Sequence, residues 1–132
     1  MITQDITING KTATVGYCYA TEIAYKDMAG QDINDFMPEI TAAIGAERLP
    51  DVKKTICLIL AAMTAYYHSR NEDAPIQDTD LMNEASPLDI GKALGTIISL
   101  RGQFYALPAG EPADSASEGS ASDKRGKGKR KN

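Results

Sequence analysis

The chain has 132 residues, of which 42% are hydrophobic and 24% are charged, and it carries 18 acidic against 14 basic side chains. This length allows one domain with a single modest core, and it excludes a deep two-lobed active site. Two cysteines, Cys18 and Cys57, are too few for a disulfide framework and indicate a reducing cytoplasm. The opening residues lack a basic region followed by an apolar stretch, so we expect no secretory signal.

Hydrophobic residues at helical spacing stop at Leu107, and none larger than alanine follows Pro108. We therefore predict a folded body over residues 1–107 and a flexible tail over residues 108–132, because such a tail cannot bury enough apolar surface to offset its ordering entropy. The tail is first acidic and serine-rich and then basic. Residues 1–110 hold 14 acidic and 8 basic side chains, whereas residues 111–132 hold 4 acidic and 6 basic ones.

The first predicted element is a β-hairpin. Asn9-Gly10 lies between two segments rich in β-branched residues, which predicts strands near residues 3–8 and 11–16 joined by a tight turn. Two strands alone are marginally stable, so the hairpin must pack on a helix or pair with another chain.

Two helices are expected next. The first runs from Tyr17 to about Met28 and stops at Gly30, and one of its faces carries Tyr19, Ile23, Ala24 and Met28. Asp32 caps the second helix. The apolar side chains that repeat along the second helix are Ile33, Phe36, Met37, Ile40 and Ile44. Pro38 lies inside this pattern and should kink or restart the helix.

The central helix is capped by Asp51 and runs to about Ser69. Its broad apolar face consists of Val52, Ile56, Ile59, Leu60, Met63, Tyr66 and Tyr67. The apolar run is too short to span a bilayer, so we predict a buried helix and no membrane partner.

A short helical turn is expected near residues 80–84, followed by a last helix that Ser86 caps and Pro87 begins. Its apolar side chains are Ile90, Leu94, Ile97, Ile98, Phe104 and Tyr105, and Pro108 lies just beyond its end. The predicted fold is mainly α, a small domain of four to five helices with an N-terminal β-hairpin and a disordered C-terminal tail.

No catalytic, metal-binding or cofactor-binding constellation is visible, and we predict that the chain is not an enzyme. His68 is the only histidine, and no second histidine or clustered cysteine accompanies it. Cys57 lies about three turns before His68 on the same predicted helix, too far for the two side chains to touch. Gly91 and Gly95 lie inside a helical pattern, where close helix–helix approach is the preferred interpretation over phosphate binding.

Two sets of residues are candidates for binding a partner. Tyr66, Tyr67, Phe104 and Tyr105 lie near the C-terminal ends of the two longest predicted helices, where core packing is the alternative role. The basic end of the tail consists of Lys124, Arg125, Lys127, Lys129, Arg130 and Lys131. These cations could bind nucleic acid or an acidic partner, or simply keep the chain soluble.

Three stretches, Gly16–Met37, Lys53–Tyr67 and Asp80–Ile98, follow one another in an order that resembles the tail assembly chaperones of long-tailed bacteriophages and related prophages. The third combines a short turn, Ser86-Pro87 and an amphipathic helix. The resemblance implies a small, mainly helical protein of the host cytoplasm that binds the tape measure protein before tail-tube polymerisation. Such a protein keeps that client soluble and is absent from the mature virion.

The resemblance also implies a second form of the chain. In many such phages a ribosomal frameshift near the end of the gene makes an extended form that contacts the tail tube protein. The codons of Arg130-Lys131-Asn132 would permit a slip if they were AGA-AAA-AAC. Self-association is a further expectation. The alternatives are a small nucleic-acid-associated accessory protein that uses its basic C-terminal arm, and a structural component of the tail.

Overall fold

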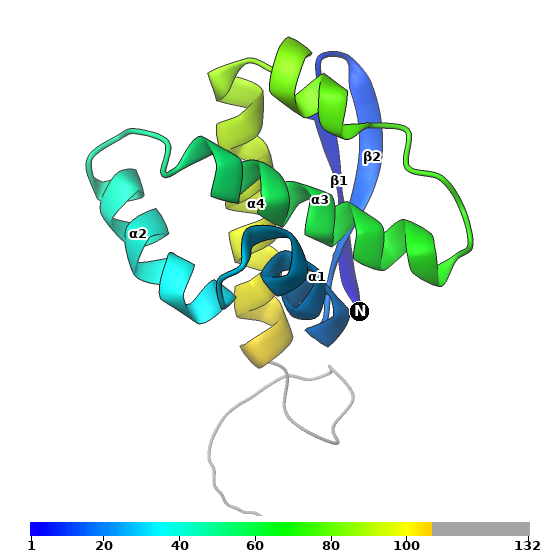
Figure 1. The fold of residues 1–132 in the computed structure, drawn as a ribbon, viewed down its shortest axis with the longest axis horizontal. Helices are drawn as coiled ribbons and strands as arrows, with labels where there is room; N and C mark the ends of the chain where they lie inside the picture. Colours follow the sequence, from blue (N-terminus) through cyan, green and yellow to red (C-terminus); the bar gives the residue numbers. More distant parts are fainter. Residues whose placement is uncertain (107–132) are drawn as a thin grey trace, which may run out of the picture.

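The computed structural model describes residues 1–106 and confirms, over that range, a mainly helical fold with an N-terminal β-hairpin (Figure 1). In chain order the elements are β1 (Ile2–Ile8), β2 (Lys11–Tyr17), α1 (Tyr19–Ala29), α2 (Ile33–Gly45), α3 (Val52–Ser69), the short helical turn η1 (Asp80–Glu84) and α4 (Pro87–Ala106). Figure 1 shows α3 crossing α4, with the hairpin and α2 on opposite sides of this crossing. The predicted tail, residues 108–132, lies outside the described residues.

The hairpin forms as its sequence predicts. Asn9 and Gly10 adopt φ values of 50° and 80°, which the tight two-residue turn requires. The register runs without a bulge from Ile8 paired with Lys11 to Ile2 paired with Tyr17. The residues of this hairpin that are buried against the helices are Ile6, Ile8, Ala13, Val15 and Tyr17. α3 packs on β2 and α4 packs on β1, so the hairpin is stabilised by helices of its own chain.

α3 is the centre of the core and is buried around most of its circumference. Its buried side chains are Thr55, Ile56, Leu58, Ile59, Ala61, Ala62, Met63 and Ala65. The small alanines let neighbouring elements approach α3 on several sides. The hydroxyl of the buried Thr55 donates a 2.8 Å hydrogen bond to the backbone carbonyl of Asp51. A single apolar cluster therefore joins the hairpin to all four α-helices.

Capping residues close to each helix end determine where the helices begin and end. Asp32 accepts a hydrogen bond from the backbone N–H of Asn34, and Asp51 accepts one from Lys54. Ser86 accepts one from the N–H of Asp89 at the start of α4. Gly30 ends α1 in the left-handed conformation at φ 70°. These caps confirm the predicted starts of α2, α3 and α4 and the predicted stop of α1.

The structure corrects the expectations for α1. Tyr17 does not open this helix, because it pairs with Ile2 as the last residue of β2. α1 begins at Tyr19, after Cys18. α1 buries Thr21 and Tyr25 against the body. Of the predicted apolar face, Ala24 packs against the core, whereas Tyr19 and Ile23 are 65% and 63% exposed.

Other expectations also fail locally. One helix runs through Pro38, so of the two predicted outcomes, a kink or a restart, the restart is wrong. Ile44, near the end of α2, and Val52, the first residue of α3, are exposed, although the periodicity placed both on apolar faces. Gly95 makes no close helix contact, since a Cβ added there would meet nothing within 4 Å. A Cβ at Gly91 would meet only the side chain of Leu49, in the loop before α3.

Candidate functional site

An aromatic surface lies where the C-terminal end of α4 meets α1. We call it the α1/α4 surface and define it by Tyr19, Ile23, Phe104 and Tyr105. Phe104 lies at the centre, with its ring centroid 5.1 Å from that of Tyr19 and 5.1 Å from that of Tyr105. Both contacts are edge-to-face, the arrangement that aromatic quadrupoles favour. The structure thus joins two predicted partner residues to two residues of the apolar face predicted for the first helix.

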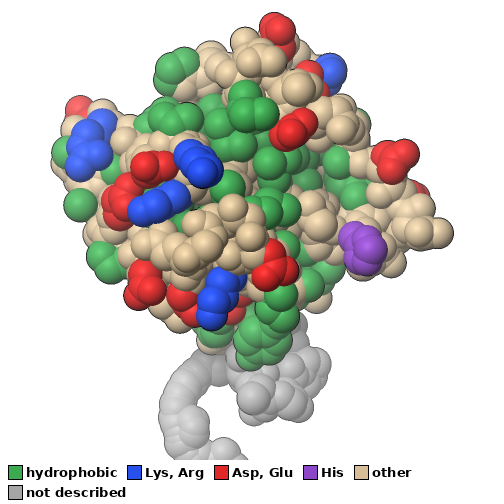
Figure 2. Space-filling model, in the orientation of Figure 1, with side chains coloured by type: hydrophobic (Ala, Val, Ile, Leu, Met, Phe, Trp, Pro, Cys, Tyr) green, Lys and Arg blue, Asp and Glu red, His purple; other side chains and the backbone are tan. Residues whose placement is uncertain are grey.

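The surface is open to solvent. Tyr105 is 50% exposed, Phe104 is half-buried, and Tyr19 and Ile23 are more exposed than either. Figure 2 shows hydrophobic side chains at the lower end of the body, where Figure 1 places α1 and the end of α4. Contiguous exposed apolar side chains of this kind mark protein interaction sites more often than isolated ones do.

Glu22 organises the polar side of this surface. Its Oε2 atom accepts a hydrogen bond of 2.7 Å from the Tyr105 hydroxyl and one of 2.8 Å from the Tyr17 hydroxyl. The hydrogen bond to Glu22 is the main cause that raises the pKa of Tyr105 to about 12. Burial, followed by the bond to Glu22, raises the pKa of Tyr17 far above its ordinary value. Both tyrosines therefore remain neutral donors at physiological pH.

Arg101 completes the arrangement from α4. Its guanidinium lies 5.1 Å from the ring centroid of Tyr105, within cation–π range. One of its terminal nitrogens donates to the side-chain carbonyl of Asn34 at 2.8 Å, which ties α4 to the start of α2. The Arg101 Nε atom is 4.0 Å from Glu22, too far for a hydrogen bond, and it has no other partner among residues 1–106. The cation thus supports the orientation of Tyr105 chiefly through charge.

The other predicted aromatic pair contacts the hairpin through Tyr67. Tyr66 and Tyr67 lie at the end of α3, with their ring centroids 4.9 Å apart, and both are half-buried. The Tyr67 hydroxyl accepts a 2.9 Å hydrogen bond from the backbone N–H of Thr14, on the edge of β2. The Tyr66 ring lies under the guanidinium of Arg70 at 5.4 Å. Among the described residues, no aromatic contact joins this pair to Phe104 or Tyr105.

Four residues in or beside the α1/α4 surface were not identified as binding candidates from the sequence. Tyr19 and Ile23 are four positions apart, and their spacing placed them only on the apolar face of the first predicted helix. Glu22 and Arg101 looked like ordinary charges on helix surfaces. Only the spatial approach of α1 to α4 reveals their roles, and no local sequence signal could have found it.

No group of three or more potential metal ligands comes together within residues 1–106. Cys18 and Cys57 are both free thiols and half-buried, and His68 is exposed at the end of α3. The six predicted tail cations, from Lys124 to Lys131, lie outside the described residues. Among the described helices, none has an apolar stretch long enough to cross a membrane.

Comparisons with protein-family models, curated proteins and solved structures find no match to this chain.

Proposed function

We propose that this chain is a binding protein and not an enzyme, and that it acts as a tail assembly chaperone whose client is a helical segment of a tape measure protein. The observation that carries the proposal is the exposed α1/α4 surface. Tyrosine and arginine are enriched at binding hot spots because they combine large apolar area with a polar end. The resemblance of three stretches of the sequence to tail assembly chaperones supplies the identity of the client.

The chemistry of the surface suits an amphipathic helix. Tyr19 and Ile23 are one turn apart on α1 and expose apolar side chains that an apolar stripe on another helix could cover. Glu22 and Arg101 hold the ring of Tyr105 at one side of this face. Because the Tyr105 side chain is already held in one orientation, it loses less conformational entropy on binding than a mobile side chain would. Several chaperone molecules would cover a long client, so protection should depend on stoichiometry.

The test is co-expression of this chain with its proposed client, a tape measure protein. We expect soluble client to increase with chaperone dose and the two proteins to purify together. The variant Tyr19→Ser/Ile23→Ser should lose both effects while it keeps native helicity. A matched control is Ile44→Ser/Val52→Ser, which removes two side chains of similar exposure, 57% and 56%, from another part of the body.

Three outcomes would overturn the proposal. The first is no gain of soluble client at any dose. The second is an equal loss in both double variants, which would mean that the α1/α4 surface is not the binding site. The third is abundant chain in purified tails, which would indicate a structural tail component. Salt-dependent DNA binding that disappears with residues 124–131 would favour the nucleic-acid alternative instead.

A further inference from the structure

The outer edge of β1 carries backbone groups that have no partner among residues 1–106. The backbone N–H of Thr14 donates to the hydroxyl of Tyr67, so it points away from β1. Thr14 and its cross-strand partner Asp5 therefore exchange no backbone hydrogen bonds. In an antiparallel ladder such pairs alternate with bonded ones, so the backbone groups of Thr3, Asp5 and Thr7 all point away from β2. No hydrogen bond from the rest of the described chain satisfies these groups.

The outward backbone groups of the two strands differ in their hydrogen bonding to the rest of the described chain. On β2 the outward N–H of Thr14 binds Tyr67 of α3, and the outward carbonyl of Gly16 accepts a 2.8 Å bond from the hydroxyl of Thr21 in α1. At Thr14 and Gly16 the β2 edge is therefore closed by helices. β1 has seven residues in unbroken register, with no lysine, proline or bulge, the usual devices that prevent strand pairing. Its one charged side chain, Asp5, accepts a 2.8 Å hydrogen bond from the hydroxyl of Thr14 on β2. The edge of β1 is therefore competent to accept another strand.

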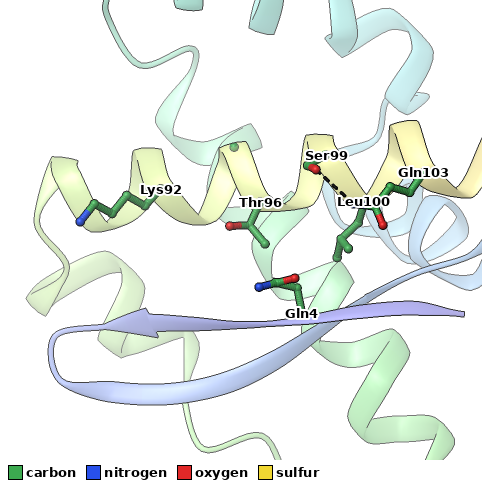
Figure 3. Close-up of a pocket in the computed structure, with 7 residues that line it drawn as sticks. Gln4, Lys92, Thr96, Ser99, Leu100 and Gln103 are labelled. Carbon is green, nitrogen blue, oxygen red and sulfur yellow. Dashed lines mark hydrogen bonds between the residues drawn. The ribbon is translucent and has the colours of Figure 1, made fainter.

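A groove lies between β1 and α4. We call it the edge groove, and its lining consists of Gln4, Lys92, Gly95, Thr96, Ser99, Leu100 and Gln103. Figure 3 shows Gln4 extending from β1 toward α4, and Gln103 hydrogen-bonded to Ser99 at 3.3 Å. The groove has a volume of about 560 Å³, within the usual range for binding sites. Its walls are mostly amides, hydroxyls and a glycine, so it suits small polar side chains.

The groove has one charged end. Lys92 lies toward the C-terminal end of β1 in Figure 3, and it makes no ion pair within residues 1–106. The rest of the groove lining is uncharged. An acidic side chain on a bound segment would complement Lys92 at that end. In an antiparallel arrangement, which is the more stable form of pairing, that acid would belong to the N-terminal end of the bound segment.

We propose that the edge groove binds an extended peptide segment of a partner protein, which adds to β1 as an antiparallel third strand. The backbone of the segment pairs with Thr3, Asp5 and Thr7, while alternate side chains enter the groove beside α4. Small hydroxyl-bearing side chains fit against Gly95 and Ser99, and an acidic residue near the N-terminus of the segment faces Lys92. This site is separate from the α1/α4 surface and does not depend on the proposed function.

The direct test measures amide hydrogen exchange by NMR on the full chain. The probe is the acetylated, amidated heptapeptide Asp-Thr-Ser-Val-Thr-Ser-Val. Without it, the amides of Thr3, Asp5 and Thr7 should exchange fast while those of Gln4 and Ile6, which bond to β2, exchange slowly. At saturation with the peptide, we expect exchange of the three outward amides to slow by about tenfold or more. A peptide methylated on the backbone amides that face β1 should give no protection, because it cannot donate to the strand.

Two glycine variants locate the site on α4. A Cβ added at Gly95 or at Gly102 meets nothing within 4 Å, so both positions accept a side chain without disturbing the body. Gly95→Leu should abolish the protection because it fills the groove, whereas Gly102→Leu, outside the groove lining, should leave it unchanged.

Unchanged exchange of Thr3, Asp5 and Thr7 at saturating peptide would overturn the proposal. So would equal protection in the Gly95→Leu protein. Protection of these amides that grows with protein concentration in the absence of peptide would also overturn it, because the occupant of the edge would then be a second copy of this chain.

Discussion

The hydroxyl of Tyr105, in the last turn of α4, donates a 2.7 Å hydrogen bond to Glu22 of α1. The same carboxylate oxygen accepts the hydroxyl of Tyr17, the last residue of β2. One acidic side chain of α1 therefore joins the strand that immediately precedes this helix to Tyr105 of α4, which lies 83 residues later in the sequence. Because hydrogen bonds to a charged acceptor are stronger than neutral ones, this junction holds the α1/α4 surface in one arrangement before any partner arrives.

The first prediction concerns alkaline pH. The bond to Glu22 raises the pKa of Tyr105 to about 12 from an ordinary value of 10.0. The stability that this shift contributes is fully present below pH 10.0 and is lost as the pH rises through about 12. In a titration followed by tyrosinate absorbance, part of the absorbance change of the Glu22→Gln protein should therefore occur at lower pH than in the wild type. The comparison is limited to pH values at which circular dichroism shows native helix. Tyr105→Phe should remove that part, and an identical curve for the Glu22→Gln protein would contradict the assignment.

The second prediction concerns the hairpin edge. Tyr67→Phe removes the acceptor for the Thr14 N–H, which is partly buried. We expect the free energy of unfolding, measured in urea, to fall by about 1–2 kcal/mol. Tyr66→Phe is the matched control, because no hydrogen bond of the Tyr66 hydroxyl occurs among residues 1–106. Equal losses in the two variants would mean that the Thr14–Tyr67 bond contributes nothing specific.

The third prediction concerns acid. Asp80 accepts hydrogen bonds from the backbone N–H of Gln77 at 2.7 Å and from Lys11 at 2.9 Å, and in this order they lower the pKa of its carboxyl below 3.8. Its contribution to stability is present above pH 3.8 and is lost as the pH falls through the lowered pKa. As the pH is lowered through this range, the urea concentration at the unfolding midpoint should therefore fall less steeply for Asp80→Asn than for the wild type.

The control for this experiment is Asp78→Asn. Asp78 lies two positions away, is exposed, and bonds only to the N–H of the next residue, Thr79. It should retain the wild-type acid dependence. If both asparagine variants behave alike, the link from Lys11 of the hairpin to η1 has no role in acid stability.

The fourth prediction concerns the core. Ile59 is fully buried in α3, so Ile59→Ala should lower the free energy of unfolding by about 2–5 kcal/mol. Ile59→Asp should prevent folding, because it places an unpaired charge among apolar side chains. Val52→Ala changes an exposed residue of the same helix and should alter stability by less than about 0.5 kcal/mol. Native circular dichroism of a soluble Ile59→Asp protein would refute the assignment of this face to the core.

Local chemistry was enough to predict most of the elements. Asn9-Gly10 specifies its turn because both residues must adopt positive φ. The helix starts after Asp32, Asp51 and Ser86 follow from side chains that bind nearby backbone N–H groups. Each of these signals acts over three or four residues, so each can be read without knowing the rest of the fold.

The candidate sites required the tertiary structure. The apolar residues of α1 have the same helical spacing whether they face the core or solvent, and only the packing of Thr21 and Tyr25 against the body decides which. The sequence also could not reveal that Glu22 meets Tyr105, or that β1 leaves its outer edge open beside α4. Residue order determined the elements through local hydrogen bonds and periodicity, whereas the faces that remain exposed depend on long-range packing, which no local pattern encodes.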